Sequence, residues 1–235
     1  AYDEAEYIAH SINSFVRKGV FSYGDSAVLY RTNAQSRLLE ERFVRENIPY
    51  KIVGGVNFYA RKEIKDLLCY LKTIDNAQDD LAVKRIINVP KRGIGATTIA
   101  KVQDYADENG MSFYAALRQA EEISTLSKAT ATKIRPFVTF IQMLRSKLPY
   151  ISVEQLMDEI IEDTGYVAEL DAEGTDEARA RIENIDELIS KIVAYEESVE
   201  QPTLSGFLEE VALIADIDNL DQDGNQVMLM TLHSA

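Results

Sequence analysis

The sequence is poor in the residues that crosslink a chain or bind a metal. Of its 235 residues one is cysteine, Cys69, and two are histidine, His10 and His233. A single cysteine excludes a disulfide within the chain and fits a reducing compartment. A cysteine–histidine metal cluster is excluded too, because such sites need three or four ligands. Sites made of carboxylates alone remain open, but no EF-hand spacing occurs, and we expect no metal site.

Long apolar segments are also lacking. No run reaches the roughly 18 residues that a membrane-spanning helix requires. The first ten residues, AYDEAEYIAH, are acidic and contain no apolar stretch of a signal peptide. The sequence therefore predicts a cytoplasmic protein with no membrane partner. Hydrophobic residues make up 46% of the chain, which is enough for the core of one large or two small domains.

Basic residues are outnumbered, but unevenly so along the chain. The net charge is −14, yet residues 152–225 carry 22 acidic and 3 basic residues, whereas the remainder has a net charge of +5. DNA binding depends on local basic contacts rather than on the total charge, so a DNA partner is compatible with this composition. Two interpretations of the acidic part remain open: a solvated helical surface, or a face that repels DNA.

Apolar periodicity predicts strands near both ends of the chain and helices between them. Strands are predicted over 26–30, 50–53 and 227–232, and helices over 3–17 and 38–46. The spacing is helical from Lys62 to about residue 215. Turn signals divide this region at Pro90, Gly110, Pro149, Gly165, Gly174 and Pro202.

The predicted fold class is mostly α with a small α/β part. Short strand–helix–strand links indicate a parallel sheet of about three strands. We predict an α/β domain formed by 1–75 and 226–235, with an all-helical domain over 76–225 inserted into it. A sheet this thin leaves uncovered edges, and the chain ends soon after the third strand, so we expect a piece of a larger protein.

One segment has a binding motif that its own residues indicate. A predicted helix over 80–88 ends before Pro90, and a loop containing Gly93-Ile94-Gly95 leads into a second helix from about Ala96, a helix–hairpin–helix arrangement. Glycines let a backbone approach a phosphate closely, and the free N–H groups that begin a helix bind an anionic oxygen. Basic residues surround the loop: Lys84, Arg85, Lys91, Arg92 and Lys101.

This motif predicts a contact with the duplex backbone that does not read base sequence. The alternative is a glycine-rich turn without a ligand. The predicted duplex contacts are Lys91, Arg92, Gly93, Ile94, Gly95, Ala96 and Thr97.

Six segments resemble the UvrD/PcrA family of superfamily 1 DNA helicases and occur in that family's order. The resemblance spans nearly the whole chain and is weakest over 112–153. It implies two RecA-like motor domains, each with an insertion, that move along single-stranded DNA and unwind duplex as ATP is hydrolysed. The chain would hold the central part of the second motor domain (2A) and its helical insertion (2B). The segments are AVLYRTNAQSR (27–37), IPYKIVGG (48–55), FYARKEIKD (58–66), NVPKRGIG (88–95), RIENIDEL (181–188) and VMLMTLHSA (227–235).

The resemblance also implies contacts with single-stranded DNA at strand ends, where α/β proteins place their ligands. Several alternatives are open: Asn33 and Ser36 could cap the following helix, and His233 could be structural. Phe58 and Tyr59 could stack on bases, but an apolar pair before a helix favours the core. We interpret His10 as a surface residue and Arg181, Glu183 and Asn184 as a packing network. The implied single-strand contacts are Arg31, Asn33, Arg37, Thr231 and His233.

The ATP site of this family requires motifs that the sequence lacks. No phosphate loop ending in Gly-Lys-Thr occurs, and neither does an Asn-Tyr-Arg-Ser run. The fifth family motif breaks off at Ala235. Phosphoryl transfer needs all of these parts. We therefore expect no cofactor, catalytic residue or helicase activity in the chain alone, whereas its full-length parent would be an ATP-dependent DNA helicase using ATP and Mg²⁺.

Two other functions remain open. A helix–hairpin–helix protein could serve DNA repair as an accessory without enzyme activity. The acidic residues 152–225 could form a module that recruits repair or polymerase proteins.

Overall fold

The computed structural model describes residues 2–218 and 224–232. Its residues group into two compact units, and helices α3, α10 and α11 contribute residues to both. The unit that we call the sheet unit comprises 1–64, 175–190 and 209–235, and the helical unit comprises 65–174 and 191–208. These two units are not the predicted domains, and the predicted insertion boundaries near residues 76 and 225 stay a prediction.

A parallel sheet organises the sheet unit, as the sequence predicts. Its strands are β1 (Ala27–Tyr30), β2 (Tyr50–Val53) and β3 (Val227–Thr231), in the order β1-β3-β2. Both pairs are parallel, with Tyr30 opposite Thr231 and Val53 opposite Met230. The carboxyl ends of all three strands therefore meet at one edge, although β3 comes from the far end of the chain.

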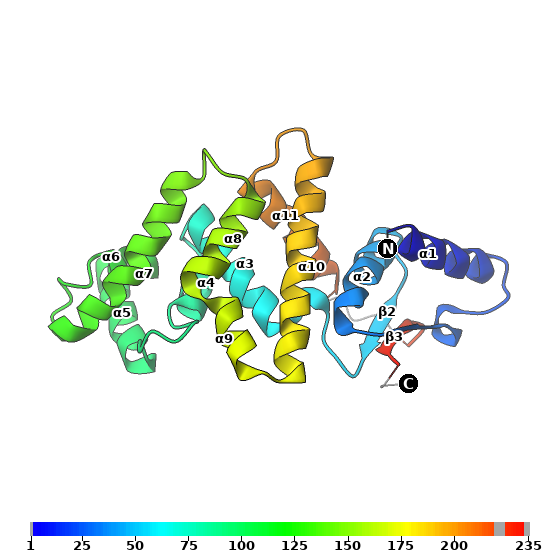
Figure 1. Ribbon diagram of the computed structural model, residues 1–235, viewed down its shortest axis with the longest axis horizontal. Coiled ribbons are helices and arrows are strands. Elements are labelled where there is room, and N and C mark those ends of the chain that lie inside the picture. Colours follow the sequence, from blue (N-terminus) through cyan, green and yellow to red (C-terminus); the bar gives the residue numbers. More distant parts are fainter. Residues whose placement is uncertain (1, 219–223, 233–235) are drawn as a thin grey trace. The chain divides into compact units, whose positions relative to one another are not determined.

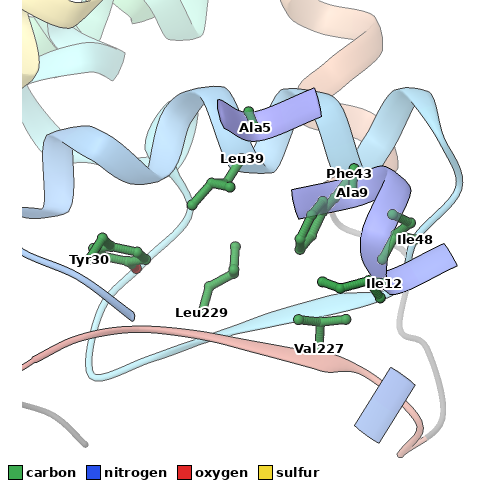
Figure 2. Packing of buried hydrophobic residues seen from close by; sticks show 9 residues of the cluster. All are labelled: Ala5, Ala9, Ile12, Tyr30, Leu39, Phe43, Ile48, Val227 and Leu229. Carbon is green, nitrogen blue, oxygen red and sulfur yellow. The ribbon is translucent and has the colours of Figure 1, made fainter. Parts of the chain in front are cut away.

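Two helices cover one face of this sheet and bury its core. These helices are α1 (Tyr2–Arg17) and α2 (Ser36–Arg45). Figure 2 shows Phe43 of α2 and Ile12 of α1 directed toward Val227 of β3. The apolar spacing of α1 places Ile8, Ile12, Phe15 and Val16 on one face, but Phe15 is 44% exposed and packs against Phe21, with ring centroids 5.2 Å apart. The small Ala5 and Ala9 occupy the buried face instead, and His10 is exposed as interpreted.

Three short 3-10 turns complete the loops of the sheet unit. They are η1 (Tyr23–Asp25), η2 (Asn33–Gln35) and η3 (Phe58–Ala60). Phe58 and Tyr59 in η3 are buried and pack edge to face with centroids 5.1 Å apart. This confirms the core interpretation for the pair, because neither ring has the exposed face that base stacking needs.

The helical unit begins on α3 (Lys62–Asp75) (Figure 1). Each predicted turn signal falls between two helices, whereas no turn signal was predicted for the breaks at 76–79 and 119–127. Ser112, Ser127 and Ser152 accept backbone N–H groups at helix starts. Gly110 ends its helix in the left-handed region that favours glycine. The further helices are α4 (Asp80–Ile86), α5 (Ala96–Asn109), α6 (Phe113–Arg118), α7 (Lys128–Lys147), α8 (Val153–Thr164), α9 (Tyr166–Glu173), α10 (Asp176–Ser198) and α11 (Leu204–Asp218). Within the described ranges, no helix is both long enough and apolar enough to cross a bilayer.

Alkaline pH is expected to destabilise the sheet unit through Tyr59. Burial raises the pKa of its phenol well above 10.0, and Glu41, which accepts its O–H at 2.8 Å, raises the pKa further. The neutral phenol therefore contributes stability that is complete below about pH 10 and is lost as the pH rises through the folded-state pKa. Urea unfolding at about pH 8 and about pH 11 measures this loss. Between the two pH values, Tyr59→Phe should lose less free energy of unfolding than the wild type. Equal losses would mean that Tyr59 is not the cause of the pH dependence.

Candidate nucleic-acid interface

The side chain of Gln35, which was not predicted to have a role, bonds to the backbone of the loop after β1. Oε1 of Gln35 accepts the N–H of Arg31 at 2.9 Å and that of Thr32 at 3.3 Å. Thr32 and Gln35 form the capping box of η2, so they satisfy the backbone where the chain turns from strand to helix. The alternative that Asn33 and Ser36 cap the following helix is not seen, because the N-cap of α2 is Gln35 and no side-chain cap bond forms there.

Asn33 itself is exposed, and in the described part of the chain its side chain has no hydrogen-bond partner. Its Oδ1 lies 3.9 Å from the position that a Cβ atom on Gly55 would take. The loops after β1 and β2 therefore meet at the carboxyl edge of the sheet. An outward amide at this edge can both donate and accept hydrogen bonds to a ligand.

Two other predicted single-strand contacts share this edge. Arg31 follows β1 directly and is exposed. Thr231 ends β3 opposite Tyr30 and is partly exposed. The structure thus brings together Arg31, Asn33 and Thr231, whereas the predicted contact His233 lies outside the described residues.

The fifth predicted contact, Arg37, occupies a different place. Its side chain is 2% exposed, and its Nη1 and Nε bond to Glu41 at 3.1 Å and Glu187 at 3.0 Å. A guanidinium held in this way presents no surface to a DNA strand. In this structure Arg37 is a structural residue of α2, which corrects the role that the resemblance implied.

The glycine loop joins α4 to α5, as the sequence predicts for this segment. Oδ1 of Asn88 accepts the N–H groups of Arg92 at 2.8 Å and Ile94 at 3.1 Å, so one side chain shapes the turn. Gly93 has φ +70°, a conformation that favours glycine. Ile94 is 1% exposed and anchors the loop in the core. Its backbone can serve a ligand, but its side chain cannot.

The first turn of α5 leaves backbone donors open. Gly95 is the N-cap and supplies no side chain, while its carbonyl accepts the N–H groups of Thr98 and Ile99. Among the described residues, the N–H groups of Ala96 and Thr97 have no acceptor, and both residues are exposed. These donors sit at the positive end of a fourteen-residue helix. The arrangement suits an anionic oxygen.

Most of the predicted cations around this loop have partners within the protein. Nη1 of Arg92 donates into a group of four carbonyl oxygens at the end of α4 and in the loop, the nearest that of Ile86 at 2.9 Å, and Nη2 lies 2.6 Å from the Tyr70 hydroxyl. Arg92 therefore stabilises the loop through bonds within the protein, and its guanidinium is not directed at a ligand. Lys101 donates to a backbone carbonyl, Arg85 pairs with Asp66, and Lys84 lies over the Phe113 ring.

Two lysines at the loop itself remain. Lys91 is exposed in the loop, with no hydrogen-bond or ion-pair partner in the described ranges. Lys133, on α7, is exposed, and its Nζ lies 3.5 Å from the position that a Cβ atom on Gly93 would take. The sequence analysis missed Lys133, because it comes 40 residues after the loop and no local pattern marks it.

The whole sequence is similar to known proteins. Over residues 1–235 the sequence matches the UvrD-like helicase C-terminal domain. The chain belongs to this family. It is 47% identical over 235 residues to the ATP-dependent DNA helicase PcrA of Staphylococcus aureus strain Mu50, an alignment that covers 99% of the chain and 32% of that protein. It is 46% identical to the PcrA of Staphylococcus epidermidis strain ATCC 12228, with the same coverage. The chain spans about a third of the length of these relatives.

Proposed function

We propose that the chain is the DNA-contacting part of an ATP-dependent DNA helicase. The observation that carries the proposal is the open first turn of α5, whose free N–H groups follow a loop that contains the exposed Lys91 and that Lys133 approaches at Gly93. Membership of the UvrD-like helicase family and the printed function of the PcrA relatives support it. Such a helicase acts by moving along one strand and separating the duplex.

The duplex contact in this proposal is the loop with its two flanking helices, as a helix–hairpin–helix within an inserted helical domain. Backbone N–H groups of Gly95, Ala96 and Thr97 would bind one phosphate, and the two lysines would neutralise neighbouring ones. Contacts of this kind fix position on DNA without reading its sequence. Arg92 and Ile94 hold the loop in shape and make no side-chain contact.

The single-strand contact is the carboxyl edge of the sheet. Asn33 offers an amide that is open in the folded chain, and Arg31 and Thr231 lie at the carboxyl ends of the adjacent strands β1 and β3. We propose that a strand lying across this edge contacts all three. This assignment uses the resemblance to helicases together with the general placement of ligands at strand ends.

The chain does not supply a nucleotide site of its own. It contains no Gly-Lys-Thr or Gly-Lys-Ser sequence, and its described residues include no group of three or more acidic, histidine or cysteine side chains arranged for a metal. These residues do not fit ATP with Mg²⁺. In the proposal, ATP and Mg²⁺ belong to the whole helicase.

Titration of the chain into fluorescently labelled DNA, followed by anisotropy, tests the duplex contact. Blunt duplex, tailed duplex and single strand should be compared at two salt concentrations. We expect tighter binding to the two duplex-containing forms, falling as salt rises, because phosphate contacts release counterions. Lys133→Gln should lower the slope of log affinity against log salt by about one.

Lys128→Gln is the matched control, since Lys128 lies on the same helix, is exposed and carries the same charge. If both lysine variants reduce the slope equally, Lys133 has no particular role at the loop. If no duplex form binds in a salt-dependent way, the proposed duplex contact is wrong.

A further inference from the structure

A buried hydroxyl supports the backbone of the loop that holds Asn33. Ser36 begins α2 and is 0% exposed. Its Oγ lies 2.9 Å from the carbonyl oxygen of Asn33 and also contacts the Glu40 carboxylate, so its one proton has two acceptors. A third group also bonds to this oxygen.

That group is Arg61, which lies just after η3 and is 7% exposed. Its Nη2 donates to Oγ of Ser36 at 2.7 Å, and its Nη1 donates to Oδ1 of Asn184 at 2.7 Å. With Arg61 donating to Oγ, the hydroxyl proton is left to point at its acceptors. Charge-assisted donors of this geometry are strong and directional.

Asn184, which is far from Arg61 in the sequence, is the other hydrogen-bond partner of the guanidinium. It lies on α10, is 5% exposed, and donates from Nδ2 to Oε1 of Glu63 at 2.6 Å. The positive Arg61 is thus enclosed by Asn184 and the carboxylates of Glu40 and Glu63, which compensate for its burial. A chain of hydrogen bonds runs from α10 through Arg61 and Ser36 to the backbone of Asn33.

We infer that Ser36, Arg61 and Asn184 are positioning residues for single-strand binding. They fix the backbone of the Asn33 loop before DNA arrives, so the amide is already held outward at the sheet edge. A contact that is organised in advance avoids the entropy cost of ordering a loop on binding. None of the three needs to touch DNA, because all are buried. The inference rests on the proposed contact of Asn33 with the strand.

A double-mutant cycle on Asn33 and Ser36 tests this role in the intact chain, with labelled oligothymidine as the probe. Ser36→Ala removes one hydroxyl and leaves the buried charges in place. We expect it to weaken single-strand binding about three- to tenfold. In the Asn33→Ala background the same change should weaken binding less than about twofold, since the contact being positioned is gone. Arg61→Lys keeps the charge but cannot reach both partners, and should act like Ser36→Ala.

Two readouts separate positioning from a general loss of structure. Binding of blunt duplex should be unchanged in every variant. Thr73→Val is the matched control: Thr73 is 0% exposed and donates to a backbone carbonyl at 2.8 Å, in the helical unit. Thr73→Val should lower the free energy of unfolding about as much as Ser36→Ala does, and it should not change the affinity for single-stranded DNA.

The outcomes are distinguishable. If Asn33→Ala does not weaken single-strand binding, the proposed strand contact is wrong and the inference falls with it. If Asn33→Ala weakens binding but Ser36→Ala has no effect, or has the same effect in both backgrounds, only the positioning role is refuted. A parallel loss of duplex affinity would also refute it, as a purely structural defect.

Discussion

Replacing Arg37 by methionine is expected to lower the free energy of unfolding by about 3–5 kcal/mol. Its guanidinium is 2% exposed and pairs with Glu41 and Glu187. Methionine keeps most of the volume but leaves the buried Glu41 carboxylate without its cation. Removing one partner of a buried pair costs more than the pair contributes, because a charge stays behind in a poorly solvated place. Urea denaturation followed by circular dichroism measures the change.

Arg45→Met is the control for this experiment. Arg45 lies on the same helix and pairs with Glu210 at 3.5 Å, but its side chain is 58% exposed. Exposed pairs contribute less than about 1 kcal/mol, so this variant should unfold at nearly the wild-type urea concentration. Equal losses in the two variants would mean that Arg37 is not held by buried pairing. The residue would then be available to DNA, as the family resemblance implied.

The sequence predicts the strands and most helix ends correctly because these depend on short-range patterns. Tyr50–Val53 is predicted to the residue, and Gly110 marks the end of α5. The order β1-β3-β2 was not predicted. A local apolar pattern shows that a strand is buried, but it does not show which strand will be its neighbour. The placement of β3 between β1 and β2 is settled by packing over a long separation in sequence.

For the candidate sites, the sequence predicts the backbone better than the side chains. The inward position of Ile94 follows from its apolar nature in a polar loop. Arg37 and Arg92 show the limit: a basic residue in a motif indicates charge, but not where the guanidinium points. Both turn inward to acceptors that only the folded chain assembles. Lys133 shows the converse, a cation placed beside the loop by tertiary packing alone.

Gly95→Val is expected to weaken duplex binding tenfold or more, which corresponds to about 1.4 kcal/mol. Gly95 has φ −92° and ψ 176°, an extended conformation that valine adopts readily. Apart from its two chain neighbours, nothing lies within 4 Å of the position that its Cβ would take, so a side chain there starts in open space. The added methyl groups would stand at the first turn of α5 and block a phosphate from the N–H groups of Ala96 and Thr97. Anisotropy titration with blunt duplex measures the loss.

Two further substitutions distinguish an effect on the loop from the loss of stability that replacing any glycine with positive φ causes. Gly93→Ala forces alanine into φ +70°, and Gly110→Ala forces it into φ +61° at the other end of α5. Both should destabilise the fold by about 1–2 kcal/mol. Only Gly93→Ala should also weaken duplex binding, because its φ of +70° strains the turn that leads into the open end of α5. If Gly110→Ala weakens binding as much, or if Gly95→Val binds like the wild type, DNA does not dock on this loop. The open donors of α5 would then be a helix start that faces only solvent.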